Sequence, residues 1–544
     1  MTTQLSRRSV LKAAAATGAA AVLPAATAGA AVVLPAVPAA AEAFKHPGLL
    51  HTQTDFDRMR AQVNAGAQPW KAGWDRLTAN GRSKSTWKPR PLETVVRGGT
   101  GANHVQLAID VAAAYQNALR WKISGEKAHG DAARDILNAW SAALKAVTGN
   151  ADRYLAAGIL GWQLANVAEI MRGYPGFDFE RFTKMMLTVF YPMNDRFLKE
   201  HNGACITNYW ANWDLCTMAS VLAIGVLCDD RAKVDQAVDY FKHGKGNGSI
   251  MNAVPFLHPG GLGQWQESGR DQGHTSVGVG WMAVICEMAW NQGIDLYGYA
   301  DDRFMKGAEY VAKYNLGESV PFTTYKWGQG TTCVQRQQSE ISAAGRGAAD
   351  PIWALLLNHY GVRRGLAVPY IEAYSKRVAP EGGGGDYGGS KYDHLGFGTL
   401  TFTRATAGSG GGLLATGVSR VFRPVNRPEA YIQATGRIGA EPVTLRVVPG
   451  LADAKAYSFV DPEGRYLRHR DFLIRFEAND GTALFRRDAT FHARPGTAEG
   501  SVRLESLNYP GRFVRHRADR LRLDKTDNTA LFRPDTSFHP TPPA

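Results

Sequence analysis

The stretch GRYLRHR at residues 464–470 returns about 47 residues later as GRFVRHR at 511–517. A second pair keeps the same spacing, because TALFRRDATFH at 482–492 returns as TALFRPDTSFH at 529–539. Short segments of alternating polarity, separated by Asn, Asp and Gly, are typical of β-strands joined by tight turns. At this period they predict a β-trefoil, in which each repeat forms about a third of a barrel.

A histidine and an aspartate recur at one separation within this repeat. One reading is structural: the aspartates cap turns and the histidines pack beneath them. The other is a shallow pocket in which imidazole and carboxylate bind sugar hydroxyls beside an aromatic ring. The candidate sugar-binding residues are Tyr466, His469, Asp488, Phe513, His516 and Asp535.

Residues 418–541, with these paired motifs, closely resemble the arabinose-binding β-trefoil at the C-terminus of arabinofuranosidase B enzymes. The resemblance implies binding of arabinofuranose side chains at His469/Asp488 and at His516/Asp535. The first lobe, around 431–436, is shortened and lacks the His and Asp, so we expect at most two working pockets. Such modules also accompany enzymes that never cut arabinosides, so they indicate sugar binding rather than a bond that is cut.

The N-terminus reads as a targeting segment. Ser6-Arg7-Arg8-Ser9-Val10-Leu11-Lys12 precedes an Ala-rich apolar run that ends at Ala41-Glu42-Ala43. This looks like a twin-arginine export signal spanning 1–43, with removal favoured over a membrane anchor because prolines interrupt the run. We therefore expect a secreted, extracellular protein with no membrane partner.

The net charge limits the classes of binding partner, and the cysteine content limits the disulfides and metal sites that the chain can form. The net charge of +13 favours either a nucleic acid or an acidic polymer, and export argues against nucleic acid. Simple solubility remains an alternative explanation of the charge. Five cysteines do not form a disulfide framework, although one bridge is possible, and their spacing matches no zinc site. We expect no metal and no cofactor, and the oligomeric state stays open.

Residues 44–405 show repeated helical periodicity. A segment at 107–119 carries apolar residues at three- and four-residue spacing, stops near Ser124-Gly125, and is followed by another at 132–144. Serial hairpins of this kind pack as a bundle, a solenoid or a closed α/α toroid, and periodicity does not choose among them. A linker at 406–417 would separate this domain from the β-trefoil at 418–544.

Two polar and aromatic clusters interrupt the helical pattern, at 201–214 and 258–274. Sugar clefts use this mixture, because indoles stack on sugar faces while amides and Arg bind hydroxyls and carboxylates. A buried polar network that braces helix ends is the structural alternative.

Asn208 and Asn212 together with Arg270 and His274, set among helical hairpins, resemble the alginate-lyase-like superfamily of polysaccharide lyases over about 45–405. This resemblance implies an α/α toroid and cleavage of a uronic-acid polymer, of alginate or glucuronan type, by β-elimination. The Asn-Asn-His-x-Tyr-Trp run of better-known alginate lyases is here 207–213 without the His, so the base must come from elsewhere. Glucuronan-type or mannuronate-type lyases of related subfamilies therefore fit at least as well.

The expected roles follow from that chemistry. Asn208 and Arg270 neutralise the uronate carboxylate, His274 is the base, and Tyr325 is the acid, with Tyr209 and Tyr299 as its alternatives. The expected substrate-binding residues are Asn103, His104, Trp210, Asn212, Trp213, Trp265 and Glu267. Two other functions remain open: a glycoside hydrolase, including arabinofuranosidase-type activity, using Glu267 with Asp271 or Asp214, and a non-catalytic sugar-binding protein.

Overall fold

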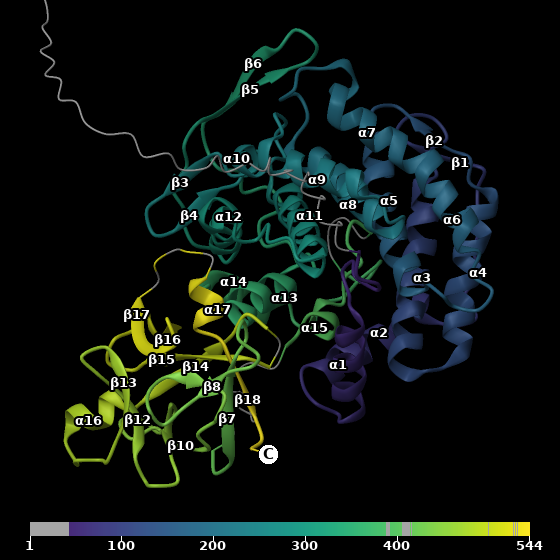
Figure 1. The fold of residues 1–544 in the computed structure, drawn as a ribbon. Helices are drawn as coiled ribbons and strands as arrows, with labels where there is room; N and C mark the ends of the chain where they lie inside the picture. The colour runs from purple at the N-terminus through teal and green to yellow at the C-terminus, as the bar shows by residue number, and fades with distance from the viewer. Residues whose placement is uncertain are drawn as a thin grey trace, which may run out of the picture. The chain divides into compact units, whose positions relative to one another are not determined.

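The computed structural model describes residues 43–387, 392–404, 414, 416–498, 500–525, 527, 529 and 531–543. Residues 1–42 of the expected signal, residue 405, and residues 406–413 and 415 of the expected linker lie outside the described residues. Figure 1 shows a helical part followed by a β part.

The helical part is built from long helices joined by short turns (Figure 1). Its elements before the first candidate segment are α1 Gln53–Asn64, α2 Trp70–Ala79, β1 Thr94–Arg97, α3 His104–Ser124, α4 Lys127–Ala143, β2 Ala146–Gly149, α5 Arg153–Ile170, α6 Phe179–Met185 and α7 Tyr191–Glu200. Those that follow are α8 Ala211–Leu227, α9 Arg231–His243, α10 Ile250–Ala253, β3 Phe256–His258, β4 Leu262–Gln264, α11 Gln272–Asn291, α12 Tyr299–Asn315, β5 Tyr325–Gln329, β6 Val334–Gln338, α13 Trp353–Leu356, α14 Pro369–Val378 and α15 Gly398–Thr401.

Three helices form the centre of this part. Every residue of α5 from Ala156 to Ile170 is buried, every residue of α8 except Trp213, and most of α11. A helix that is apolar on all sides must be covered on all sides, so α8 packs against both α5 and α11. The paired helices α3–α4 and α8–α9 confirm the predicted helical hairpins.

The β part closes on itself. Strands β7 and β10 pair with each other, and the ring continues through β11, β14, β15 and β18 back to β7. Three hairpins accompany this ring: β8–β9, β12–β13 and β16–β17. The strand bounds are β7 Ser419–Pro424, β8 Tyr431–Ile432, β9 Ile438–Gly439, β10 Leu445–Pro449, β11 Tyr457–Val460, β12 Tyr466–Arg470, β13 Leu473–Glu477, β14 Phe491–Pro495, β15 Val502–Ser506, β16 Arg512–Arg517, β17 Arg520–Lys525 and β18 Phe538–Thr541.

The sequence repeat maps onto this arrangement element by element. The stretches 464–470 and 511–517 carry β12 and β16, each the first strand of a hairpin. The second motif carries the short helices α16 Ala483–Asp488 and α17 Phe532–Asp535, followed by β14 and β18. Phe422, Phe459, Phe491 and Phe538 are fully buried in one cluster, so alternate residues of the ring strands supply the core.

One disulfide joins Cys205 to Cys333, and Cys216, Cys228 and Cys286 are free. The bridge anchors the turn of the β5–β6 hairpin to the segment before α8. Among the described residues, no helix combines the length and apolar character needed to cross a bilayer.

The close approach of α11 to a neighbouring loop gives a stability prediction. A Cβ at Gly280 would lie 2.3 Å from Cε1 of His394 and 2.5 Å from Cγ2 of Ile352, both in the core. We expect Gly280→Ala to lower the free energy of unfolding by about 1–3 kcal/mol through overpacking. Gly273→Ala in the same helix is the control, because its Cβ would meet only Oδ1 of Asp271 at 3.3 Å. Urea denaturation that finds both variants equally stable would contradict this packing.

Candidate active site and sugar-binding pockets

The first turn of α11 fixes His274. Asp271 is the N-cap residue, and its Oδ1 accepts the backbone N–H of His274 at 2.7 Å. The other oxygen, Oδ2, lies 2.8 Å from Nδ1 of the same histidine. Because a carboxylate only accepts, Nδ1 carries the proton in the neutral ring and Nε2 presents its lone pair.

Arg270 lies against that lone pair. Its Nη2 is 3.1 Å from Nε2 of His274, and its guanidinium sits 5.3 Å from the ring centre of Trp210. Arg270 precedes the helix, and its side chain nevertheless meets that of His274. A guanidinium and an imidazole therefore share one partly exposed corner of the molecule.

A buried carboxylate holds Arg270 in place. Glu267 is 0% exposed, and its Oε2 accepts Nη1 of Arg270 at 2.9 Å while Oε1 accepts the backbone N–H of Asn212 at 2.8 Å. Burial raises the pKa of Glu267 to about 7, against the opposing charge of Arg270. Glu267 therefore ties the start of α8 to the arginine and has no surface of its own for a sugar.

Aromatic rings line the neighbouring hairpin. The rings of Trp210 and Trp327 lie 4.9 Å apart, and Trp327 stacks on Tyr325 at 6.0 Å. The hydroxyl of Tyr325 donates to Oδ1 of Asn247 at 2.8 Å, and burial raises its pKa to about 12. Tyr325 thus keeps its proton near neutral pH, as an acid requires.

Asn208 belongs to the anchor of the same hairpin. Its Oδ1 accepts the backbone N–H of Gly330 at 2.7 Å, and the adjacent Thr207 hydroxyl bonds both the N–H and the carbonyl of Gly328. With the Cys205–Cys333 disulfide, these bonds tie β5–β6 to the start of α8. Asn208 itself is half-buried.

The remaining expected substrate-binding residues differ in how far they are buried. Trp265 is fully buried against Phe304 and Gly278, and Asn103 braces β1 by accepting the N–H of Val96 at 2.7 Å. Trp213 is partly exposed and packs on Tyr209 at 4.4 Å. Asn212 is buried, and its Oδ1 has no hydrogen-bond partner among the described residues.

His104 lines a separate cavity of about 210 Å³ with Arg97, Tyr392 and Asp393. Burial, and then the charge of Arg97, lower the pKa of His104. In the described part of the chain, no three His, Cys, Asp or Glu side chains are grouped to hold a metal ion.

Sequence reasoning missed Asn247 and Trp327. Asn247 donates to the carbonyls of Thr207 and Tyr209 at 2.9 and 2.7 Å, while it accepts from Tyr325. Its glycine-rich surroundings at 244–248 were the available signal of a close backbone approach. Trp327 lies two residues beyond Tyr325 in one strand, and residues two apart in a strand point to the same face of the sheet. This alternation was the available signal that both rings share one face.

The two repeats of the β part form matching polar networks. Nε2 of His469 lies 2.9 Å from Oδ1 of Asn508, whose amide nitrogen donates to Asp488 at 2.7 Å, and Arg468 bonds the other oxygen of Asp488 at 2.6 Å. In the second repeat, Nε2 of His516 lies 2.9 Å from Oδ1 of Asn426, and the amide nitrogen of Asn426 donates to Asp535 at 2.9 Å. Arg515 bonds the other oxygen of Asp535 at 2.8 Å.

Each asparagine comes from a different part of the repeat than its histidine. Asn508 follows β15 and Asn426 follows β7, so each network joins two lobes. Burial lowers the pKa of both His469 and His516, which are therefore neutral near pH 7. The described hairpin β8–β9 of the first lobe carries no such histidine and aspartate, as the sequence predicted.

The rings expected beside these networks pack against the short helices. Tyr466 meets the edge of Phe485 at 6.2 Å, and Phe513 meets Phe532 at 6.3 Å. Tyr509, which sequence reasoning did not select, is 42% exposed and lies 5.4 Å from the ring of His469. An exposed ring beside a polar pocket is the arrangement that stacks on a sugar face.

Models of two known families match different parts of the chain. Residues 77–322 match the family model described as alginate lyase, and residues 426–539 match that of the alpha-L-arabinofuranosidase B (ABFB) domain. Residues 4–24, outside the described part, match the twin-arginine translocation pathway signal sequence, which indicates export. Both resemblances and the export signal inferred from sequence are confirmed.

Relatives match short stretches only. The chain is 43% identical over 72 residues to alpha-L-arabinofuranosidase B of Aspergillus niger, and 47% identical over 53 residues to that of Aspergillus kawachii. These stretches span 14% and 11% of the two relatives.

Solved structures are similarly distant. Alginate lyase A1-III from Sphingomonas species A1 aligns with 67% of this chain and 98% of its own at 15% identity and a TM-score of 0.42. A GH54 arabinofuranosidase covers 27% of this chain and 35% of its own, at 25% identity and a TM-score of 0.23.

Glu267 gives a prediction for pH-dependent stability. The pKa of Glu267 is about 7 in the folded protein and 4.5 when the side chain is exposed. Protonated Glu267 therefore favours folding below pH 4.5, and this contribution to the free energy of unfolding is lost as the pH rises through 7. Between pH 5 and 8, we expect the free energy of unfolding to fall by on the order of 1–2 kcal/mol less in Glu267→Gln than in the unaltered protein. Urea titrations at both pH values test this. An unchanged slope in the variant would show that Glu267 does not titrate in this range.

Proposed function

We propose that this chain is a secreted polysaccharide lyase that cleaves a uronic-acid polymer by β-elimination. The contact between Arg270 and His274, braced by buried Glu267, carries the proposal. The alginate-lyase family match over 77–322 supports the same reaction class.

The chemistry explains why a cation must lie beside the base. The proton removed in β-elimination sits next to an ionised carboxylate, and its removal would place a second negative charge on the same group. Donors aimed at that carboxylate stabilise the enolate-like state, which is the largest single contribution a site of this kind makes. A general acid then protonates the departing glycosidic oxygen.

The side chains suit these roles. Arg270 and the amide of Asn208 bind the carboxylate, and the guanidinium then turns from His274 toward the substrate. His274 accepts the proton at Nε2, while Asp271 holds Nδ1–H and stabilises the imidazolium that forms. Tyr325, protonated and linked to Asn247, supplies the proton to the leaving oxygen.

The hydrolase alternative has weaker support. A pair of free carboxylates is required on either side of the bond that is cut. Both oxygens of Glu267 are already bonded, and Asp214 is fully buried with its Oδ1 2.8 Å from Nε2 of His201. Only Asp271 is partly exposed, and it is bonded to His274.

For the architecture, we propose an α/α toroid at 44–405, a linker at 406–417 and a β-trefoil at 418–544. The ring of β7, β10, β11, β14, β15 and β18 with three hairpins supports the trefoil. The networks at His469 and His516 are proposed to bind arabinofuranosyl side chains, because neutral imidazole, amide and carboxylate together offer donors and acceptors to sugar hydroxyls. The proposed partners are thus an acidic and an arabinose-bearing polysaccharide.

The reaction is tested by its product. On a panel of alginate, glucuronan and mannuronan, we expect an ultraviolet-absorbing 4,5-unsaturated product, whereas hydrolysis yields reducing ends alone. Arg270→Ala and His274→Ala should each lose on the order of a hundredfold or more in turnover while staying folded. Activity should fall at acid pH, because a protonated imidazole accepts no proton. A folded His274→Ala protein with a near-native elimination rate would move the base to a tyrosine, Tyr325 first.

The β part is tested by retention. We expect His469→Ala combined with His516→Ala to abolish retention on arabinose-bearing polysaccharide, while cleavage of a soluble substrate continues. The matched control is His492→Ala with His539→Ala, which changes the other histidine of each repeat, on β14 and β18. If the first double variant is retained like the unaltered protein, the proposed pockets are wrong.

A further inference from the structure

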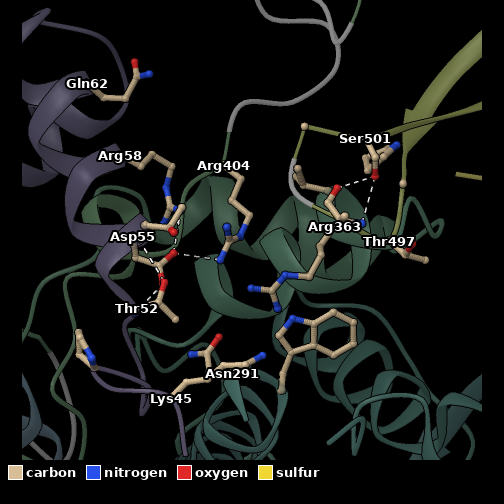
Figure 2. Close-up of a pocket in the computed structure, with 18 of the residues that line it drawn as sticks. Lys45, Thr52, Asp55, Arg58, Gln62, Asn291, Arg363, Arg404, Thr497 and Ser501 are labelled. Carbon is tan, nitrogen blue, oxygen red and sulfur yellow. Dashed lines mark hydrogen bonds and ion pairs between the residues drawn. The ribbon is translucent and has the colours of Figure 1, made fainter. Parts of the chain in front are cut away.

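A second pocket lies at the far end of α11 from His274. It encloses about 680 Å³ and is lined by side chains of α1, the end of α11, Arg363 and Arg404, with residues 495–498 and 500–501 of the β part on one side (Figure 2). Trp290 and Asn291 mark its position on α11. At 1.5 Å per residue, His274 is roughly 25 Å away along the helix, so this pocket is separate from the candidate active site.

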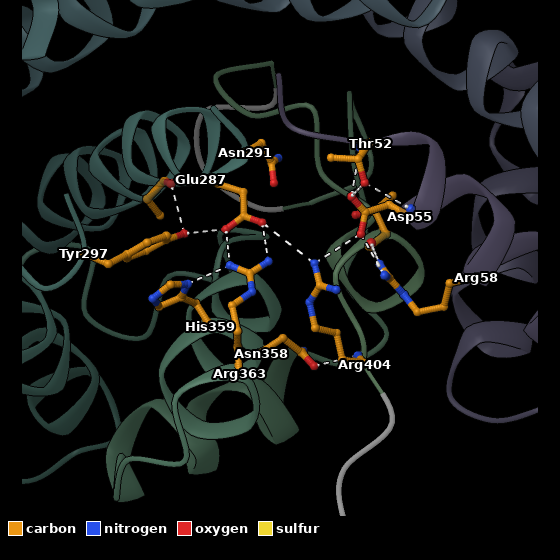
Figure 3. Close-up of polar contacts among 12 residues, drawn as sticks. Thr52, Asp55, Arg58, Glu287, Asn291, Tyr297, Asn358, His359, Arg363 and Arg404 are labelled. Atoms are coloured by element: carbon orange, nitrogen blue, oxygen red, sulfur yellow. Dashed lines mark hydrogen bonds and ion pairs between the residues drawn. The ribbon is translucent and has the colours of Figure 1, made fainter. Parts of the chain in front are cut away.

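Arginines outnumber carboxylates in its wall (Figure 3). Arg363 bonds both oxygens of Glu287 at 2.8 and 3.0 Å. Arg404 lies 3.1 Å and Arg58 2.7 Å from the same oxygen of Asp55. Three guanidinium groups therefore share two carboxylates, and Lys45 adds a further positive charge at the rim.

The excess charge is held in place by burial. Glu287 is 1% exposed and also accepts the hydroxyl of Tyr297 at 3.0 Å. Burial, and then the charges of Arg363 and Arg58, lower the pKa of Arg404 to about 10. Since like charges that crowd together are relieved by an anion, the wall is preorganised for one.

The rest of the lining suits a sugar. The indole of Trp290 is half-buried, with Arg363 5.2 Å from its ring centre and His359 at 5.0 Å on its edge. Gln62, Asn291 and Thr52 bring amide and hydroxyl groups to the same space. Arg363 is already bonded to both oxygens of Glu287, so the other cations that line the pocket, Arg58, Arg404 and Lys45, are the ones placed to meet a sugar carboxylate. The ring and the amides beside them suit the rest of a sugar acid.

We propose that this pocket binds a uronate residue of an acidic oligosaccharide, as a second site that holds the polymer away from the cleavage site. The choice of a uronate rests on the proposed function, whereas the preference for a carboxylate rests on the arginines alone. Such a site would raise the local concentration of substrate chains at the catalytic end.

The test uses the full chain carrying Arg270→Ala and His274→Ala, so that no turnover occurs. Calorimetric titration with mannuronate and glucuronate trisaccharides should detect one remaining binding event, absent with the carboxyl-reduced, neutral trisaccharides. Adding Arg58→Gln and Lys45→Gln should weaken this event by about tenfold or more. Arg60→Gln with Lys71→Gln is the matched control, because it removes one exposed and one half-buried cation from α1 and α2 outside the pocket.

Several results would overturn the pocket. These are no remaining event, an event insensitive to Arg58→Gln and Lys45→Gln, or equal binding of the neutral trisaccharide. Competition by inorganic sulfate at equal concentration would show that the pocket binds anions in general and does not select a uronate. Failure of the lyase proposal is seen separately, as a lack of unsaturated product from the unaltered protein.

Discussion

The bond between Arg270 and buried Glu267 is the constraint on which the candidate active site depends. It joins the start of α8, through the backbone of Asn212, to the residue that precedes α11. Breaking such a pair by removing one partner leaves a buried group uncompensated, which costs more than an exposed ion pair contributes. The position of the guanidinium beside His274 and Trp210 is therefore set by the fold and not by the flexible side chain alone.

The opposite end of α11 repeats this device. There Glu287, within the helix, fixes Arg363, and the surplus arginines Arg58 and Arg404 gather around Asp55. At both ends a carboxylate removed from solvent fixes the position of a guanidinium, which is also bonded to a histidine. This arrangement lowers the cost of ordering long side chains on binding, because that cost is met on folding.

The sequence predicted the periodic parts of the molecule and missed contacts between distant segments. Helical spacing predicted α3 and α4, and the repeat predicted β12 and β16, because both signals are local. It did not indicate that Trp265 would be packed in the core or that Asn103 would brace β1. The pairing of His469 with Asn508 and of His516 with Asn426 joins different lobes, and Cys205 is bonded to Cys333, 128 residues further along the chain. Such pairings depend on how the chain returns to itself, which composition and spacing do not specify.

The two parts of the chain use different physics to bind sugar under the proposals made above. The arginine sites attract a carboxylate by charge, and added salt screens exposed charges of this kind. The His469 and His516 networks present neutral imidazoles, and each of their carboxylates is already paired with an arginine, so their hydrogen bonds to hydroxyls carry little net charge. Sugar binding by the β part would then persist at salt concentrations that weaken binding of an acidic polymer by the helical part. Under these proposals, the β part would keep the chain attached to the polysaccharide at those salt concentrations.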